Sequence, residues 1–388
     1  MRVNRRVLRG VGRGAAVLVA AALAAGALVA ADAIERPGYR VEAPSVVVEP
    51  QEGRQARVCP GPLLELADDS AAATTASSFG PASVVTAADP ADAVIEQVGL
   101  EAPGNPDAAA DGSPVVIVSA PGAVDAGMLA GAQSQTASGD AVSGFSASPC
   151  IEPAAEAWLV GGATDVGRST LVLLANPGDV ASTVDVRVIG ETGTVDAPSA
   201  VGIIVPARSQ RVLSLAGLAP NVVSPVVHVT ASGGPIAATL EHTIVRGLDP
   251  SGAELVSPVA SPAPEQVIAG FVVPSAGGVA PQVDEAAGDE FPVVRLFAPG
   301  EDAVDGAIDV VDDSGEVVSA IDVSLQAGQV SDVPLGSLQS GAYTVRLEGS
   351  GPIIAAARAT VFAAADGGDP APVDFAWTVL RNLLRKQN

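Results

Sequence analysis

The chain has 388 residues and a formal net charge of −24 at pH 7. Only 3% of its residues are aromatic, so its cores must be built mainly from Val, Leu, Ile and Ala, which bury less area per residue than Phe or Trp. A surface this acidic repels nucleic acid and anionic lipid, and it excludes nucleic acid as a partner.

Residues 1–33 are predicted to direct the chain to the membrane. Five arginines precede residue 14, and an uncharged run rich in Ala, Val and Leu reaches from Gly14 to Ala31. This asymmetry predicts a cytoplasmic N-terminus and an exported remainder. An uncut run is a single-pass anchor that leaves the body on the extracytoplasmic side of the cell membrane, whereas cleavage near Ala33 gives a secreted protein.

Residues 39–153 are predicted to form an irregular β domain closed by a disulfide. Cys59 and Cys150 are the two cysteines of the chain, and an isolated pair in an exported protein is most simply a disulfide. Between them, short runs with strand character alternate with clusters of Pro, Gly, Asp and Ser. The candidate strands of this region are residues 45–49, 56–59, 83–86, 93–98, 114–119 and 130–136.

Two segments of the chain repeat one another, and we refer to residues 158–245 as the first copy and residues 271–361 as the second. Residues 171–178 (LVLLANPG) of the first copy align with residues 293–300 (VVRLFAPG) of the second. Other short matches follow, and their offset drifts only where turn-forming residues gather. Loops of unequal length between matching strands produce such a drift.

Within each copy, hydrophobic residues alternate with polar ones. In residues 184–188 (VDVRV) the valines share one face and the charged residues the other, which is typical of half-buried antiparallel strands. About seven short strands fit in each copy, near the count of an immunoglobulin-like sandwich. The sequence therefore predicts an all-β chain, with tandem immunoglobulin-like β-sandwich domains at residues 154–250 and 265–365, behind the N-terminal anchor or signal helix.

Residues 366–388 are predicted to be a linker followed by a short basic amphipathic tail. Leu380, Leu383 and Leu384 lie at helical spacing beside basic residues, which favours a helix over residues 375–386. Such a helix either docks as a terminal segment or contacts a membrane surface or a partner. It would expose Trp377, which we take as a candidate contact residue.

One further pattern carries a family resemblance. Residues 144–150 (GFSASPC), Pro153, residues 158–162 (WLVGG) and residues 171–178 follow one another. This succession resembles an actinobacterial envelope or secreted family that is catalogued only as a domain of unknown function, and the resemblance covers most of the chain after the N-terminal segment. Members of that family are regarded as anchored or secreted and are often encoded near envelope glycan genes. The resemblance implies an exported β protein, and it brings no catalytic residues.

The sequence predicts that the chain is not an enzyme. His228 and His242 lie on strands that we expect to pair through a turn at residues 232–234, and on these strands both should face solvent. Neither histidine belongs to a nucleophile or metal motif, and Glu241 points to the strand face opposite His242. The sequence therefore offers no catalytic residue, cofactor site or metal ligand.

Carboxylates gather in two places. Those of residues 309–316 fit a solvated hairpin tip, because their spacing does not match an EF-hand calcium loop. The others lie in a loop that only the second copy has, and such a loop is a candidate contact site. Its acidic residues are Asp284, Glu285, Asp289 and Glu290.

Together these patterns favour a non-catalytic extracytoplasmic envelope protein that acts as a scaffold or protein-binding element. Its expected partners are the membrane, through the N-terminal helix, and a further envelope protein. The alternative is a carbohydrate-binding or accessory protein in cell-envelope glycan assembly, with a glycan as the partner. Sandwich folds carry many unrelated roles, so the architecture does not choose between these functions.

Overall fold

The computed structural model describes residues 19–23, 25–26, 55–66, 76–89, 91, 93–102, 114–119, 128–274, 291–363 and 371–379. The chain divides into two units, residues 1–51 and 52–388. In the first unit the described residues are helical. Among all described residues, no helix is both long enough and apolar enough to cross a membrane. The rest of the predicted anchor or signal segment, including Ala33, lies outside the described residues.

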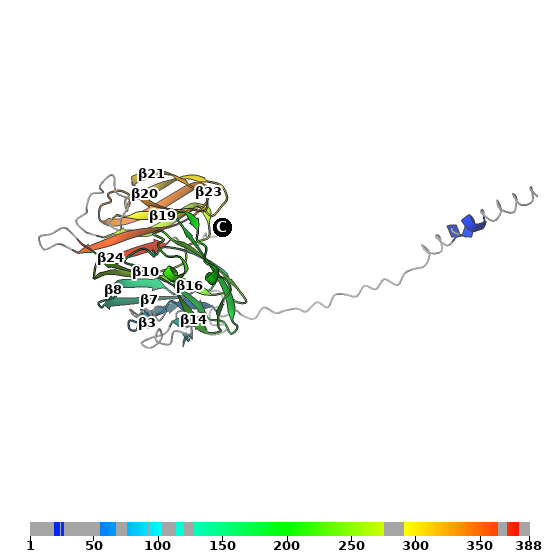
Figure 1. Ribbon diagram of the computed structural model, residues 1–388, viewed down its shortest axis with the longest axis horizontal. Helices are drawn as coiled ribbons and strands as arrows, with labels where there is room; N and C mark the ends of the chain where they lie inside the picture. Colours follow the sequence, from blue (N-terminus) through cyan, green and yellow to red (C-terminus); the bar gives the residue numbers. More distant parts are fainter. Residues whose placement is uncertain are drawn as a thin grey trace, which may run out of the picture. The chain divides into compact units, whose positions relative to one another are not determined.

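The second unit is nearly all β, as predicted (Figure 1). Its N-terminal part forms three small sheets, with strand orders β1-β6-β5, β2-β3 and β4-β7-β8. Five of the predicted ranges in this region match a strand to within two residues at each end. Residues 45–49 lie outside the described residues, and β2, β3 and β8 were not predicted. The strands are β1 (Ala56–Cys59), β2 (Leu64–Leu66), β3 (Ala76–Ser78), β4 (Ser83–Ala88), β5 (Ile95–Gly99), β6 (Val115–Ser119), β7 (Leu129–Ser138) and β8 (Ser143–Pro149).

A disulfide between Cys59 and Cys150 closes this N-terminal part and confirms the predicted pairing. Cys59 ends β1 and Cys150 follows β8. Beside them, Val58 and Ile151 exchange two backbone hydrogen bonds of 2.8 Å, and the cysteines share a small buried cluster with Ile117. The disulfide therefore joins the sheet of β1 to the sheet of β7 and β8.

The first copy folds into two facing sheets. One sheet has the strand order β14-β10-β16-β17, and the other has the order β12-β11-β15-β9, with β13 also paired to β11. The alternating valines of β11 point into the core between the sheets. The strands are β9 (Glu156–Val160), β10 (Arg168–Asn176), β11 (Ser182–Gly190), β12 (Gly193–Thr194), β13 (Ile203–Val205), β14 (Ser209–Ser214), β15 (Val226–Ser232), β16 (Ala237–Arg246) and β17 (Asp249–Val256).

The second copy repeats the strand pairing of the first. β19 lies between β22 and β23, as β10 lies between β14 and β16. β20 lies between β21 and β23, as β11 lies between β12 and β15. β18 and β24 pair with the two halves of β23, as β9 pairs with β15 and β17 with β16. The strands are β18 (Ala263–Val273), β19 (Val293–Phe297), β20 (Val304–Val311), β21 (Val317–Leu325), β22 (Val330–Pro334), β23 (Gly341–Ala363) and β24 (Ala371–Val379).

The turn at residues 232–234 does not form the predicted hairpin, and this prediction is wrong. β15 and β16 belong to different sheets. Gly233 has a positive φ of 92°, and Pro235 has no N–H to donate to a ladder, so the chain leaves one sheet and enters the other here. In the second copy, β23 passes the equivalent point without a break and pairs first with β20 and then with β19.

The β14-β10-β16-β17 sheet of the first copy is covered on both faces. Along β10, Val172 and Leu174 enter the core between the two sheets. Leu171 and Leu173 point the other way and pack against the N-terminal part of the unit. A strand that is buried on both faces reads as a continuous apolar run, which explains why β10 lacks the alternation of β11.

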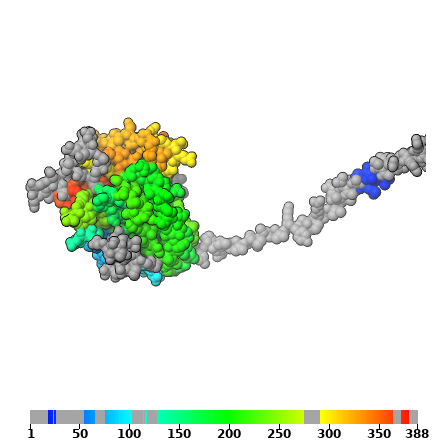
Figure 2. Space-filling view, in the orientation of Figure 1, coloured from blue at the N-terminus to red at the C-terminus, as the bar shows by residue number. Residues whose placement is uncertain are grey.

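The two copies meet in a shared buried cluster, although the second copy also has a core cluster of its own. Phe297 and Ile354 of the second copy, with Trp377 of β24, are buried in the same cluster as Val172 and Leu240 of the first. In Figure 2 the surface of the first copy (green) meets that of the second (orange) directly. The described parts of the two copies therefore pack directly against each other and are not independent domains joined only by a linker.

The predicted C-terminal helix is wrong where it can be compared. Residues 375–379 belong to β24, which pairs with the second half of β23. Phe375 and Trp377 are buried, and Ala376 between them is exposed, which is the period of a strand. Residues 380–388, which supplied the helical leucine spacing, lie outside the described residues.

Candidate functional site

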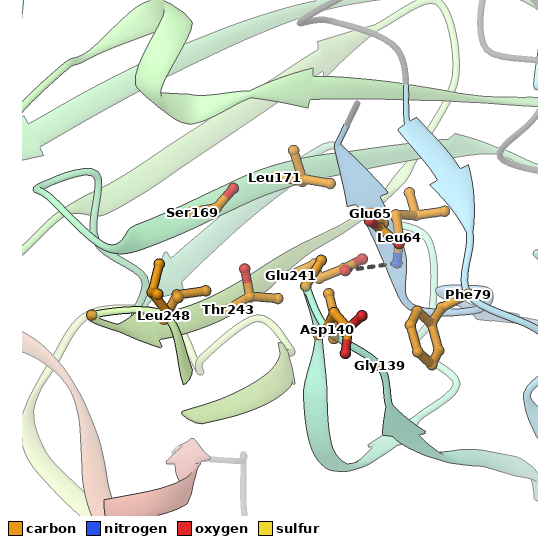
Figure 3. Close-up of a pocket in the computed structure, with 14 residues that line it drawn as sticks. Leu64, Glu65, Phe79, Gly139, Asp140, Ser169, Leu171, Glu241, Thr243 and Leu248 are labelled. Atoms are coloured by element: carbon orange, nitrogen blue, oxygen red, sulfur yellow. Dashed lines mark hydrogen bonds between the residues drawn. The ribbon is translucent and has the colours of Figure 1, made fainter. Parts of the chain in front are cut away.

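A pocket of about 670 Å³ lies where the N-terminal part covers the outer face of the β14-β10-β16-β17 sheet (Figure 3). This volume is in the range of small-molecule sites. The residues that line it come from β2, the end of β3, the turn between β7 and β8, strands β10 and β16, and the turn between β16 and β17. They are Leu64, Glu65, Phe79, Gly139, Asp140, Ala141, Val142, Ser169, Leu171, Glu241, Thr243, Val245, Gly247 and Leu248.

The strand register explains which side chains reach the pocket. On β10 and β16, Leu171 is opposite Glu241 and Ser169 is opposite Thr243. Opposite residues of an antiparallel pair share a face, so all four side chains project toward the N-terminal part. The sheet therefore supplies a carboxyl group, two hydroxyl groups and an apolar wall to one side of the pocket.

Glu241 is the deepest polar group of the site, with 1% of its surface exposed. The backbone N–H of Leu64 donates to its Oε1 at 2.7 Å. Its Oε2 has no hydrogen-bond partner among the described residues. Burial raises the pKa of Glu241 to about 8, against the lowering effect of the Leu64 hydrogen bond. At neutral pH this side chain is therefore largely a neutral carboxylic acid.

The rim of the pocket combines charge with apolar surface. Asp140 is exposed and Glu65 half-buried, and both bring carboxylates close to the mouth. Phe79 contributes an aromatic ring, and Leu248 is 93% exposed at the tip of the β16–β17 connection. Such a pocket can hydrogen-bond a polar ligand and cover its apolar face.

The buried carboxyl group of Glu254 and the half-buried one of Asp374 lie where β8 and β17 meet β24. Glu254 accepts hydrogen bonds from the N–H of Leu255 at 2.8 Å and from the hydroxyl of Ser146 at 3.1 Å. Asp374 accepts one at 2.8 Å from the N–H of Phe145. Burial raises the pKa of Glu254 to about 8, and the nearby charge of Asp374 adds to the rise. Burial also raises the pKa of Asp374, against several backbone hydrogen bonds.

Replacing Glu254 by glutamine is expected to stabilise the protein at pH 8. The folded-state pKa of about 8 lies above the ordinary value of 4.5, so the native state binds the extra proton between these values, and its stability falls as pH rises from about 5 to 8. The amide keeps the size of the side chain and removes the cost of ionisation, a gain on the order of 3 kcal/mol. Urea denaturation at pH 5, 6, 7 and 8 measures it.

Glu348→Gln, at an exposed position of β23, is the control for this change, because it removes one formal charge without touching a buried group. Its pH profile should match that of the wild type. An unchanged profile for Glu254→Gln as well would show that Glu254 does not titrate in the way that its burial requires.

The two histidines that were predicted to face solvent, His228 and His242, differ in how far they are buried. His242 is fully buried and lies against the ring of Phe375, with 4.8 Å between ring centroids, so its predicted exposure is wrong. The reason is that β16 is an inner strand of a sheet covered on both faces. His228 is half-buried, stacks on Trp158 at 3.8 Å and pairs with Glu156 at 2.7 Å.

The predicted exposure of Trp377 is also wrong, because 8% of its surface is accessible. The guanidinium of Arg295 lies 4.9 Å from its ring centroid. Arg295 itself is 1% exposed and donates to both carboxylate oxygens of Asp332, at 2.8 and 3.0 Å. It also donates to backbone carbonyls of the first copy, including that of Gly162 at 2.8 Å. These residues form a buried contact between the copies.

Burial alone would raise the pKa of Asp332. The charge of Arg295, together with hydrogen bonds from Arg295 and Ser224, outweighs this effect and lowers the pKa below its ordinary value. A charged residue inside the apolar run of residues 293–297 was the available sequence signal for this contact. At that position the first copy has Leu173.

The remaining predicted sites are simpler. The loop residues Asp284, Glu285, Asp289 and Glu290 lie outside the described residues. At the tip between β20 and β21, Asp312 accepts hydrogen bonds from Ser314 and Glu316 and its pKa is lowered, chiefly by the Ser314 hydroxyl. In the described part of the chain, no group of three or more His, Cys, Asp or Glu residues could hold a metal ion.

The fold and the pocket define an all-β protein with a disulfide, a duplicated two-sheet module and a small-molecule-sized cavity. The model of a family described as "Family of unknown function (DUF5719)" matches residues 105–384. The chain belongs to this family. No curated protein matches it, and neither does any solved structure.

Proposed function

We propose that this chain is a non-catalytic extracytoplasmic protein of the cell envelope that acts as a scaffold or protein-binding element. The observation that carries this proposal is the buried cluster shared by the two copies, in which Phe297 of the second copy and Trp377 of β24 pack with Val172 of the first. Modules that share a core hold their exposed surfaces at fixed positions, which suits a scaffold. The Cys59–Cys150 disulfide supports an oxidising compartment.

The proposed placement in the envelope rests on residues 1–33. Five arginines before an uncharged apolar run favour a cytoplasmic N-terminus and an exported body. We propose a single-pass anchor, or secretion after cleavage near Ala33.

We also propose that each copy is a variant of the immunoglobulin-like sandwich. The pairs β10–β14 and β11–β15 correspond to the B–E and C–F pairs of that fold. The first and last strands are exchanged, since β9 lies beside β15 and β16 lies beside β10. In an immunoglobulin domain, strand A belongs to the sheet of strand B, and strand G to the sheet of strand F.

The alternative is a carbohydrate-binding or accessory protein in envelope glycan assembly, and the pocket is what favours it. A sugar ring presents an apolar C–H face and a rim of hydroxyl groups. The ring of Phe79 suits the first, and the hydroxyls of Ser169 and Thr243 with the carboxylates of Glu65 and Asp140 suit the second.

Photo-crosslinking at the pocket rim in intact cells distinguishes these functions. With p-benzoylphenylalanine in place of Leu248, an adduct with another protein is expected for a protein-binding scaffold, and an adduct that stains for carbohydrate is expected for a glycan-binding protein. The matched control is the same replacement of Val201, an aliphatic residue that is 65% exposed and lies outside the pocket. Equal adducts from both positions, or none from Leu248, would count against both functions for this surface.

A further inference from the structure

We propose that the pocket beside Glu241 binds an ammonium group carried on a small carbon skeleton, so that its ligand is an organic amine or an amino sugar. This inference deepens the proposed binding role of the pocket and rests on that role. It starts from the one deeply buried polar group that lines the cavity.

One of the two carboxyl oxygens of Glu241 already has a hydrogen-bond partner. The backbone N–H of Leu64 donates to Oε1 at 2.7 Å, and Figure 3 shows this bond among the residues that line the pocket, which include Thr243 and Asp140. Oε2 has no partner among the described residues. A buried polar atom without a partner costs free energy, and a ligand that donates to Oε2 would recover it.

The surroundings of Glu241 favour a cation as that donor. Around the cavity the titratable residues are Glu65 of β2, Asp140 of the β7–β8 turn and Glu241 itself, and no Arg, Lys or His is among the described residues that line it. The cross-strand neighbours of Glu241, Leu171 and Leu255, are apolar. Three acidic side chains with no basic one make the pocket attractive to positive charge, and the low dielectric strengthens that attraction.

The walls of the pocket suit a carbon skeleton behind the ammonium group. Leu64, Leu171 and Val245 line it together with the ring of Phe79. An aromatic face attracts a cation within about 6 Å, and the aliphatic walls cover methylene or ring C–H groups. The ammonium group would form a charge-assisted hydrogen bond with Glu241.

This mode of binding has a pH signature. Burial raises the pKa of Glu241 to about 8, so an ammonium ion must displace the proton of the carboxylic acid at neutral pH. Below that pKa, affinity should then increase about tenfold for each unit by which the pH rises, and at a pH well below it one proton should leave the protein on binding. A neutral hydroxyl ligand that accepts a hydrogen bond from the protonated acid would show the opposite dependence.

Isothermal titration calorimetry of the full exported body, residues 34–388, at pH 6, 7 and 8 tests the proposal. The ligands are butylammonium and glucosamine, with butanol and glucose as their uncharged counterparts. At least one of the two amines should bind more tightly at pH 8 than at pH 6, by about fiftyfold if the amine itself stays protonated throughout, and its uncharged counterpart should bind at least tenfold more weakly at pH 8. At pH 6, titration in buffers of different ionisation enthalpy should show release of one proton.

Two variants locate the site. Glu241→Gln should abolish the pH dependence and weaken amine binding at least tenfold at pH 8, whereas Glu254→Gln, a buried carboxyl outside the pocket, should leave binding unchanged. Glu241→Gln should fold, since the amide keeps the hydrogen bond from Leu64 and removes an ionisable buried group, and circular dichroism checks this.

Each outcome has a defined meaning. Binding of glucosamine alone supports an amino sugar, and binding of butylammonium as well supports recognition of the ammonium group on any small skeleton. Equal binding of glucose and glucosamine would overturn the ammonium proposal and leave carbohydrate binding standing. Binding of neither amine, or full amine affinity in Glu241→Gln, would also overturn it.

Discussion

Replacing Arg295 by methionine is expected to destabilise the protein by about 3 to 5 kcal/mol. Arg295 is buried, it pairs with Asp332 through two hydrogen bonds, and its remaining donors reach carbonyls of the first copy. Without the guanidinium, the half-buried Asp332 keeps a charge that has lost its partner, and the carbonyl of Gly162 loses a donor. Trp377 loses the cation beside its ring. The penalty comes mainly from the charge that is left behind.

Urea denaturation at pH 7 measures this effect through a shift of the midpoint at constant slope. The control is Arg208→Ala, since Arg208 pairs with Asp179 at the surface, where the side chains are 58% and 78% exposed. That change should cost less than about 1 kcal/mol. The double variant Arg295→Met/Asp332→Leu should lose less stability than Arg295→Met alone, because neither charge remains. Similar losses for Arg295→Met and Arg208→Ala would contradict a role for Arg295 in holding the copies together.

Removing the disulfide with Cys59→Ala/Cys150→Ala is expected to cost about 4 to 5 kcal/mol. The bond spans 91 positions, and a closed loop of that length removes much of the conformational freedom of the unfolded chain. The N-terminal part has small sheets of two or three strands, so it depends on this bond more than the duplicated modules do. It should therefore be the first region to lose protection from hydrogen exchange.

The same urea experiment under oxidising and reducing conditions provides the check. Dithiothreitol should move the wild-type midpoint to that of the double alanine variant and should leave the variant itself unchanged. If the variant stays within about 1 kcal/mol of the oxidised wild type, the backbone bonds between Val58 and Ile151 and the small core around Ile117 close this loop without the covalent bond.

The strands could be predicted from the sequence because their signals are local. Such signals include the alternating residues of β11 and the turn residues around Asp312. Each extends over only a few positions, so it can be recognised without knowing the partner strand. The disulfide was predictable for another reason, since Cys59 and Cys150 had no competing partner. The similar order of apolar segments in the two copies likewise needed only the sequence.

The candidate site could not be predicted in the same way. Period-two alternation correctly put Glu241 and His242 on opposite faces of β16, but it does not show what covers each face. Glu241 is buried because the N-terminal part, more than a hundred positions earlier in the chain, supplies Leu64. His242 is buried because β24, more than a hundred positions later, supplies Phe375. Both contacts depend on segments that no local pattern connects.

By itself the sequence determined the all-β character, the disulfide pair and the positions of many strands, because backbone periodicity and turn chemistry are properties of neighbouring residues. Only the tertiary structure decided that residues 232–234 carry the chain from one sheet to the other, that Trp377 lies in a strand at the junction of the copies, and that Glu241 borders a pocket. The physical reason is that burial is a property of layers. A strand specifies its two faces, and the segments that pack on those faces decide which of its polar groups lose their water.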